Sequence, residues 1–321
     1  MDGPDGRPTG EEPAVEPAAD AADGAALATN GEEPGAAVGP VRSRPPGLAG
    51  RTRHRGILWA GVTVIILFVG ALLFAILGSR GNADAVPGAD PVASLAVIRA
   101  GYLVGTTGGL AVSPDGRTWS VAHLPAELVA VAANDGSTAY VLAGGLVHTT
   151  TDLKTYTDVA SGATGTVIAA HERGVVIVGQ GNRVMRVGVD GIVEDLLPGR
   201  SEPSGLRALA ASSTDANTFL AGGPVSGLWE TTDGATTWHQ LLRTPIQAIL
   251  MDVANPKRFF VGTDGGILVS TDGGRSWTFT SFRLNTEGLA QDGGRIYAIA
   301  SDRVIYSSPD GVTGWAPVVS G

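Results

Sequence analysis

The chain has no cysteine among its 321 residues. Disulfide bonds, thiol catalysis and a lipid anchor on cysteine are therefore excluded. Lysine is almost absent as well, because Lys154 and Lys257 are the only lysines among 22 basic residues. Together with abundant alanine and glycine, this bias is typical of a GC-rich bacterial genome.

Signals for metal, cofactor and nucleic-acid binding are also missing. The histidines beyond residue 80 are scattered and never stand at the spacing of metal ligands. They are His123, His148, His171 and His239. The Gly-Gly pairs lie in hairpin-like segments, not between a strand and a helix as in a phosphate-binding loop. Residues 81–321 hold 15 basic and 22 acidic side chains, a balance unsuited to nucleic acid. We therefore predict no metal, no cofactor and no nucleic-acid partner.

One long apolar run is present. Residues 57–77 include no charged side chain, and a helix of this length spans about 31 Å, enough to cross a bilayer. We predict a transmembrane helix over residues 57–78, with membrane contact from Ile57 to Leu77. A buried core helix is the alternative, but the repeats that follow leave no place for one.

The charges on either side of this run predict its orientation. Five arginines lie close before it, whereas only Arg80 lies just after it. The five are Arg42, Arg44, Arg51, Arg53 and Arg55. The positive-inside rule predicts a single-pass protein of the cell membrane, with a cytoplasmic N-terminus and the repeats outside. A cleaved signal peptide is the rival interpretation, but its leader would be too long. Binding of these arginines to an anionic inner leaflet is a further alternative to a role in topology alone.

The segments around the predicted helix are low in apolar residues. Residues 1–40 hold nine acidic residues, one arginine and no aromatic residue, so they cannot bury enough apolar surface to become ordered. We predict a disordered cytoplasmic tail over residues 1–56 with a basic end next to the membrane. Residues 79–90 are predicted to be a short flexible stalk.

The remaining chain contains one motif six times. The clearest copy is STDGGRSW at residues 270–277. Near-copies are TTDGATTW at 231–238, SPDGVTGW at 308–315, SPDGRTW at 113–119 and TTDLKTY at 150–156, and a shorter VDG stands at 189–191. We call these the aspartate motifs. Their aspartates recur every 37 to 43 residues, a period that fits a four-stranded propeller blade. The flanking apolar runs, broken by glycine, predict four strands per repeat and no helix.

The aspartate motifs resemble the Asp-box, or BNR repeat, of sialidases, sortilin-type receptors and photosystem II assembly factors. The resemblance covers about residues 91–321 and implies an all-β fold, a six-bladed β-propeller over 91–321. An aspartate in a tight turn accepts backbone N–H groups, the next glycine supplies positive φ, and the aromatic ring packs between blades. We therefore predict structural roles for Asp115, Trp119, Asp152, Tyr156, Asp190, Asp233, Trp238, Asp272, Trp277, Asp310 and Trp315.

The resemblance also implies a binding face on the side away from the motifs. That side would carry Gln180, Asn182, Arg183, Arg200, Arg243, Asp264, Arg283, Asn285, Asp302 and Arg303. Arginine is suited to bidentate capture of carboxylates, so we predict tentative binding roles for Arg183, Arg243, Arg283, Arg303, Gln180, Asn182, Asp264 and Asp302. Ordinary solvated loop charges are the alternative.

Sialidase activity is the enzymatic alternative that the resemblance raises. Such enzymes need an arginine triad, a Tyr–Glu nucleophile pair and an acid–base Asp. Their first-blade Arg-Ile-Pro motif is here Ile98-Arg99-Ala100, and the short repeats leave little room for a pocket. We predict no catalytic residues and a membrane-tethered, non-catalytic protein-binding or assembly module. A carbohydrate-active enzyme and an envelope receptor or sensor are the alternatives.

Overall fold

The computed structural model describes residues 85–88, 90–122, 124, 129–133, 136–171, 173–196 and 203–318. The predicted tail, the predicted membrane helix and the stalk up to residue 84 lie outside these residues. Within the described part of the chain, no helix has the length and apolar character needed to cross a membrane.

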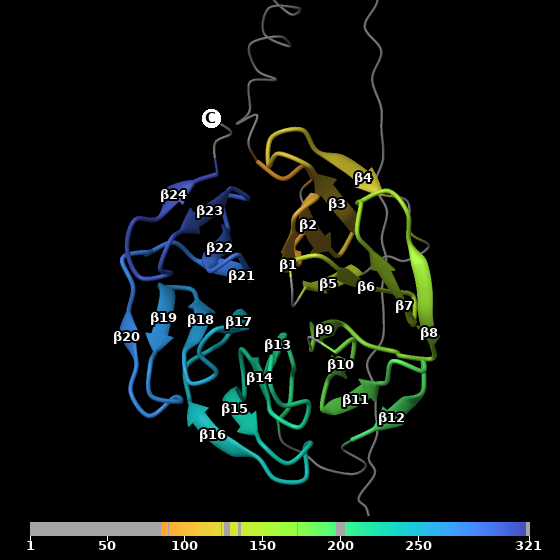
Figure 1. Cartoon of the computed structure of the whole chain (residues 1–321). Coiled ribbons are helices and arrows are strands. Elements are labelled where there is room, and N and C mark those ends of the chain that lie inside the picture. The colour runs from red at the N-terminus through yellow and green to blue at the C-terminus, as the bar shows by residue number, and fades with distance from the viewer. Residues whose placement is uncertain are drawn as a thin grey trace, which may run out of the picture. The chain divides into compact units, whose positions relative to one another are not determined.

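The described residues form six four-stranded antiparallel sheets, here blades 1 to 6, and in each blade the strands follow one another in sequence (Figure 1). Blades 1 and 2 contain β1 (Val92–Ile98), β2 (Gly101–Thr106), β3 (Gly109–Ser113), β4 (Ser120–Ala122), β5 (Val129–Ala133), β6 (Ala139–Ala143), β7 (Leu146–Thr150) and β8 (Thr157–Ser161). Blades 3 and 4 contain β9 (Val167–Ala170), β10 (Val176–Gln180), β11 (Arg183–Val187), β12 (Val193–Asp195), β13 (Ala208–Ala211), β14 (Phe219–Gly223), β15 (Gly227–Thr231) and β16 (His239–Leu242). Blades 5 and 6 contain β17 (Ala248–Met251), β18 (Phe259–Thr263), β19 (Gly266–Ser270), β20 (Thr278–Phe279), β21 (Thr286–Asp292), β22 (Arg295–Ala300), β23 (Ile305–Ser308) and β24 (Ala316–Pro317).

The blades stand around a central axis, with the first strand of each blade innermost (Figure 1). Each inner strand contacts the inner strand of the next blade, and β1 contacts β21, which closes the ring. The predicted six-bladed all-β propeller is therefore confirmed for the described residues.

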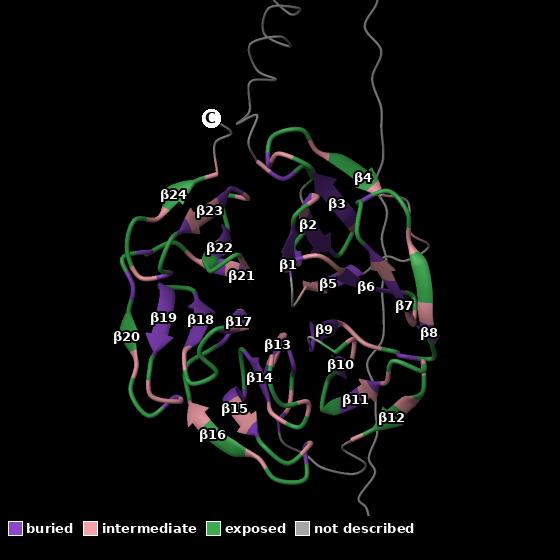
Figure 2. Cartoon of the chain, in the orientation of Figure 1, coloured by how far each residue is buried: buried purple, intermediate pink, exposed green. Residues whose placement is uncertain are grey.

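Burial follows position within a blade. The second strands are buried on both faces because neighbouring blades cover both, as in β14, where every residue is buried. The fourth strands form the outer edge and are largely exposed, as in β20 (Figure 2). This gradient explains why the second and third strands read as continuous apolar runs in the sequence.

Ring closure depends on side-chain packing and not on exchange of a whole strand. Val97 and Val104 of blade 1 share a buried cluster with Ile299 and Ile305 of blade 6. The segment before β1 pairs with blade 6 through an isolated bridge between Ala85 and Val304, with the Val86 amide donating to the Arg303 carbonyl at 2.9 Å. Residues 85–88 and 90, placed in the stalk by the sequence, thus belong to the propeller.

Each seam between neighbouring blades holds one hydrophobic cluster. Motif aromatics pack into five of these six clusters in the described structure: Trp119, Tyr156, Trp238, Trp277 and Trp315. The seam between blades 2 and 3 has no motif aromatic, and there Val193 packs instead. The third motif is short and has no aromatic residue to place in the seam. Its apolar residues Val189 and Ile192 do not fill that place, because they remain 71% and 67% exposed.

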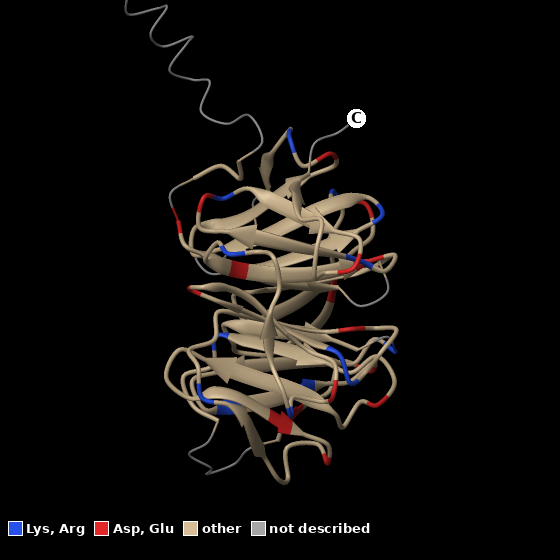
Figure 3. Ribbon diagram, turned by 90° about the vertical axis from the view of Figure 1, so that its left-hand side faces the viewer, with Lys and Arg blue, Asp and Glu red and all other residues tan. Residues whose placement is uncertain are grey.

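The antiparallel order gives the ring two distinct faces. The motif face carries the turns between first and second strands and the aspartate motifs between third and fourth strands. The connection face carries the turns between second and third strands and the links from one blade to the next. Figure 3 shows acidic and basic residues interspersed along the loops of both faces.

Candidate functional site

The aspartate of each complete motif is a hydrogen-bond acceptor for its own turn. In blade 5, Asp272 Oδ1 accepts from the amides of Arg275 and Ser276 at 3.0 and 2.9 Å, and Asp272 Oδ2 accepts from the Ser276 hydroxyl at 2.6 Å. The Ser270 hydroxyl donates to Asp272 Oδ1 at 2.8 Å and accepts from the Gly274 amide. The side chains thus pair turn amides that the strands leave open.

These hydrogen bonds also set the charge state of the aspartates. The hydroxyl and amide of Ser276 lower the pKa of Asp272 to about 2. Bonds from the threonine three or four positions later do the same for Asp115, Asp152 and Asp233, and lower the pKa of Asp310 further. A carboxylate held ionised in this way does not supply a proton near neutral pH, so these residues serve the turns rather than acid catalysis.

The third motif, at residues 189–191, is incomplete. Asp190 Oδ1 accepts one amide, that of Ile192, at 3.1 Å. This copy lacks both the serine or threonine that precedes the aspartate in the other motifs and the aromatic residue that ends them. Its predicted role as a structural aspartate is therefore reduced to a single hydrogen bond among the described residues.

The chain topology places the eight tentative binding residues on the connection face. Gln180, Asn182 and Arg183 surround the β10–β11 turn, and Asp264 lies in the β18–β19 turn. Arg243 and Arg283 follow the fourth strands β16 and β20, and Asp302 and Arg303 lie in the β22–β23 turn. Arg200, also expected on this face, lies outside the described residues.

Two of the four arginines are already occupied within the fold. Arg183 donates to Asp195 Oδ2 from Nε and Nη2 at 3.3 and 2.8 Å. Arg303 donates to three backbone carbonyls of the segment before β1, those of Val86, Pro87 and Asp90. The structure thus gives Arg303 a role in ring closure that the sequence did not reveal.

The three other polar residues with a described partner are also engaged locally. Asp302 accepts from the Tyr306 hydroxyl at 2.7 Å and from the Val304 amide at 3.0 Å. Asp264 accepts from the Gln247 side chain at 3.1 Å. Asn182 has a partner within the chain as well.

Arg243 and Arg283 differ from the other two because only neutral groups hold them. Arg243 Nε donates to Gln240 Oε1 at 3.3 Å, and the Arg283 guanidinium lies 4.5 Å from the centre of the Phe279 ring. No ion pair joins either of them to a residue that the structure describes.

These two arginines occupy equivalent positions in neighbouring blades. The Arg243 backbone lies against Gly227, the first residue of β15, and the Arg283 backbone lies against Gly266, the first residue of β19. A Cβ atom on either glycine would clash with the carbonyl oxygen of the residue before the arginine. For Gly227 this is Leu242, for Gly266 it is Phe282, and the distance would be 2.2 Å in both cases. The close approach therefore fixes where each arginine leaves the blade.

Apolar side chains accompany these arginines. Phe279 and Leu284 are 48% and 42% exposed beside Arg283, and Val225 in the β14–β15 turn is 85% exposed. Single exposed apolar residues in turns carry no periodic signal, so the sequence does not reveal them as a surface. The blade 4–5 rim, defined as Val225, Arg243, Phe279, Arg283 and Leu284, thus combines two arginines with apolar groups.

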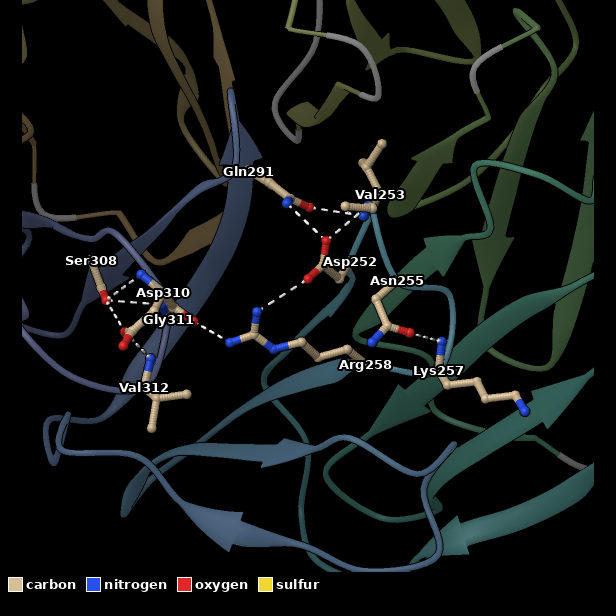
Figure 4. A network of polar contacts seen from close by, with 11 residues as sticks. Asp252, Val253, Asn255, Lys257, Arg258, Gln291, Ser308, Asp310, Gly311 and Val312 are labelled. Atoms are coloured by element: carbon tan, nitrogen blue, oxygen red, sulfur yellow. Dashed lines mark hydrogen bonds and ion pairs between the residues drawn. The ribbon is translucent and has the colours of Figure 1, made fainter.

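A polar network ties blade 5 to blade 6 on the motif face (Figure 4). Buried Asp252 pairs with Arg258 at 3.3 Å and accepts from the Gln291 amide at 3.0 Å. Arg258 also donates to the Asp310 carbonyl and lies over the Phe260 ring at 4.7 Å. The network joins the link before β18 to the inner strand β21 and to an aspartate motif, so it is structural.

An axial channel runs between the inner strands. Its volume is about 90 Å³, and its walls are mostly alanine and other apolar residues of the first strands. Arg207, Gln247 and Glu287 line it at the end where the inner strands begin. No group of three or more His, Cys, Asp or Glu residues suited to a metal ion occurs within the described structure.

Comparison with known proteins supports the fold and leaves the family open. No family model matches the chain, and no curated protein matches it. A chain of a nidogen/laminin complex has a TM-score of 0.52 at 12% identity, covering 64% of this chain and 87% of that one. YCF48 bound to a D1 peptide has a TM-score of 0.45 at 17% identity over 73% and 82% of the two chains.

A third similar structure is the extracellular domain of the hybrid two-component system BT4673 from B. thetaiotaomicron. Its TM-score is 0.45 at 16% identity, covering 70% of this chain and 39% of that one. At these identities the similarity concerns the propeller fold alone.

Proposed function

We propose that this chain is a membrane-tethered, extracytoplasmic and non-catalytic binding module whose blade 4–5 rim binds an acidic segment of a partner protein. The observation that carries this proposal is the pair Arg243 and Arg283, which lie at equivalent positions of adjacent blades and are held only by neutral groups. Two guanidinium groups in register suit carboxylates spaced along one extended peptide.

The physical setting of the rim supports binding rather than stability. Exposed arginines contribute little to folding, whereas a ring that stacks beneath a guanidinium restrains it and lowers the cost of ordering it on binding. Phe279 restrains Arg283 in this way, and the Gln240 side chain restrains Arg243. Leu284 and Val225 add apolar surface that a partner segment would cover.

The membrane anchor of the proposal comes from the apolar run at residues 57–77 and from the arginines that precede it. Because the chain has no cysteine, single cysteines report topology directly. A membrane-impermeant maleimide added to intact cells is expected to label Val189→Cys, which is exposed on the motif face, but not Asn30→Cys. Labelling of position 30 without permeabilisation, or protection of position 189, would contradict the N-in, C-out arrangement.

The binding proposal is tested by reversing the two charges. Arg243→Glu combined with Arg283→Glu should leave melting unchanged and reduce capture of partners from solubilised membranes, with the difference shrinking at high salt. Lys154→Glu combined with Arg275→Glu is the matched control, since it makes the same charge change on the motif face. Equal capture by both double variants would refute the proposal. Release of sugar from cell-wall glycans or sialosides would refute its non-catalytic part.

A further inference from the structure

The axial channel holds two opposite charges at its connection-face end. Arg207 immediately precedes β13 of blade 4, and Glu287 lies near the start of β21 in blade 6. Both line the channel, and both are partly buried. Gln247 lies at the same end, and the wall farther along the strands is mostly apolar, with residues such as Ala132, Ala170 and Ala211.

Arg207 reaches across the ring to the opposite blade. Its Nη1 donates to the Ala93 carbonyl at 3.1 Å, and its Nη2 donates to the Val92 carbonyl, both in β1. A guanidinium has five N–H donors, so these two bonds leave the others for a ligand. Both carbonyls are neutral, so the positive charge of Arg207 has no anionic contact there.

Glu287 is the corresponding negative group. Neither a hydrogen bond nor an ion pair joins its carboxylate to any residue that the structure describes. The two charges nevertheless influence each other, because burial lowers the pKa of Arg207 and the charge of Glu287 raises it. Partly buried charges are costly unless each is paired, and no ion pair joins these two described residues.

We propose that the channel binds a small zwitterion with an apolar side chain, such as a free aliphatic α-amino acid. Its carboxylate would pair with Arg207 and its ammonium with Glu287, while the side chain would extend along the alanine-lined wall. A simple anion or a simple cation satisfies one of the two charges and adds repulsion to the other. The zwitterion is therefore the ligand class that matches both.

The size of the channel agrees with this class. The channel has a volume of about 90 Å³, several times the roughly 10–15 Å³ that one water molecule needs on the same measure. It therefore has room for a small molecule, and a free amino acid such as valine or leucine is of this class.

The proposal is tested by calorimetric titration of the full-length chain with three probes that share one branched side chain. L-Leucine carries both charges, 4-methylpentanoate lacks the ammonium, and 3-methylbutylamine lacks the carboxylate. We expect leucine to bind at least 10-fold more tightly than either partial probe. No saturable binding of leucine, which would mean that the channel holds water only, or equal binding of leucine and 4-methylpentanoate, would overturn the proposal.

Variants then assign the two charges. Glu287→Gln keeps the size of the side chain, breaks no hydrogen bond within the described structure and should weaken leucine binding at least 10-fold without weakening 4-methylpentanoate. Arg207→Met should weaken both, but it also removes the bonds to β1, so its melting is compared first. Arg275→Met is the matched control, because it removes one guanidinium on the motif face, and it should leave leucine binding unchanged. Unchanged leucine affinity in Glu287→Gln would refute the assignment.

Discussion

The hydrophobic cluster between blades 5 and 6 can be tested by removing one buried ring. Phe260 is fully buried in that seam, where it contacts the Arg258 guanidinium and packs with residues such as Ile267 and Ile296. Phe260→Ala removes a whole ring from a site enclosed on all sides, so we expect a loss of about 3–5 kcal/mol of unfolding free energy. Phe279 is the matched control, because it is 48% exposed on the rim and also carries an arginine over its ring.

The two substitutions remove the same atoms, so burial alone separates them. For a domain of this size each kcal/mol corresponds to about 2–4 °C in melting temperature. Phe260→Ala should therefore lower the melting temperature by roughly 6–20 °C, and Phe279→Ala by about 4 °C at most, since surface changes cost about 1 kcal/mol or less. Differential scanning calorimetry of the two full-length variants makes the comparison. Equal shifts would refute the seam packing.

Three further predictions concern the turns and the closure. The folded pKa of Asp272, about 2, lies below its unfolded value near 3.9. The stabilisation is therefore complete above about pH 4 and is lost as pH falls towards 2. Asp272→Asn should melt at a lower temperature than wild type at pH 7, and the two melting temperatures should converge near pH 2. A difference in melting temperature that stays constant with pH would contradict this. Gly311→Ala places a methyl 2.6 Å from the Phe260 ring at φ +72°, whereas Gly273→Ala at φ +74° meets nothing. Chemical denaturation should show about 1 kcal/mol for Gly273→Ala and about 2–4 kcal/mol for Gly311→Ala, and similar values would argue against the clash. Arg303→Met should speed hydrogen exchange in the segment before β1 and leave blades 2 to 4 unchanged; unaltered exchange there would rule out the closure role.

Much of the fold is local and therefore readable from the sequence. The bonds of the aspartate motifs join residues no more than five positions apart, as between Asp272 and Ser276. A local turn depends on adjacent residue types, and the repetition of that turn at a fixed period predicted both the blade and the number of blades. The exposed edge strand after each motif followed from the same register.

The candidate site was only partly predictable for a physical reason. The sequence correctly indicated that certain loops share a face, because antiparallel order alternates loops between two ends. It gave no indication of the partners of those side chains. Arg183 and Arg303 look alike as loop arginines, yet one pairs with Asp195 on the adjacent strand and the other binds carbonyls that lie 213 to 217 residues away.

The same distinction separates the motif aspartates from the channel. An aspartate motif closes on itself, so its residues alone determine its geometry and its low pKa. Arg207 contacts β1 across 115 positions of sequence, and this contact exists only once six blades have closed into a ring. The sequence by itself determined the repeated turn, the strand order and the blade count, because these depend on neighbours along the chain. Only the tertiary structure decided which arginines remain without a carboxylate and which charged residues line the channel, because those placements depend on loops and strands that ring closure brings together.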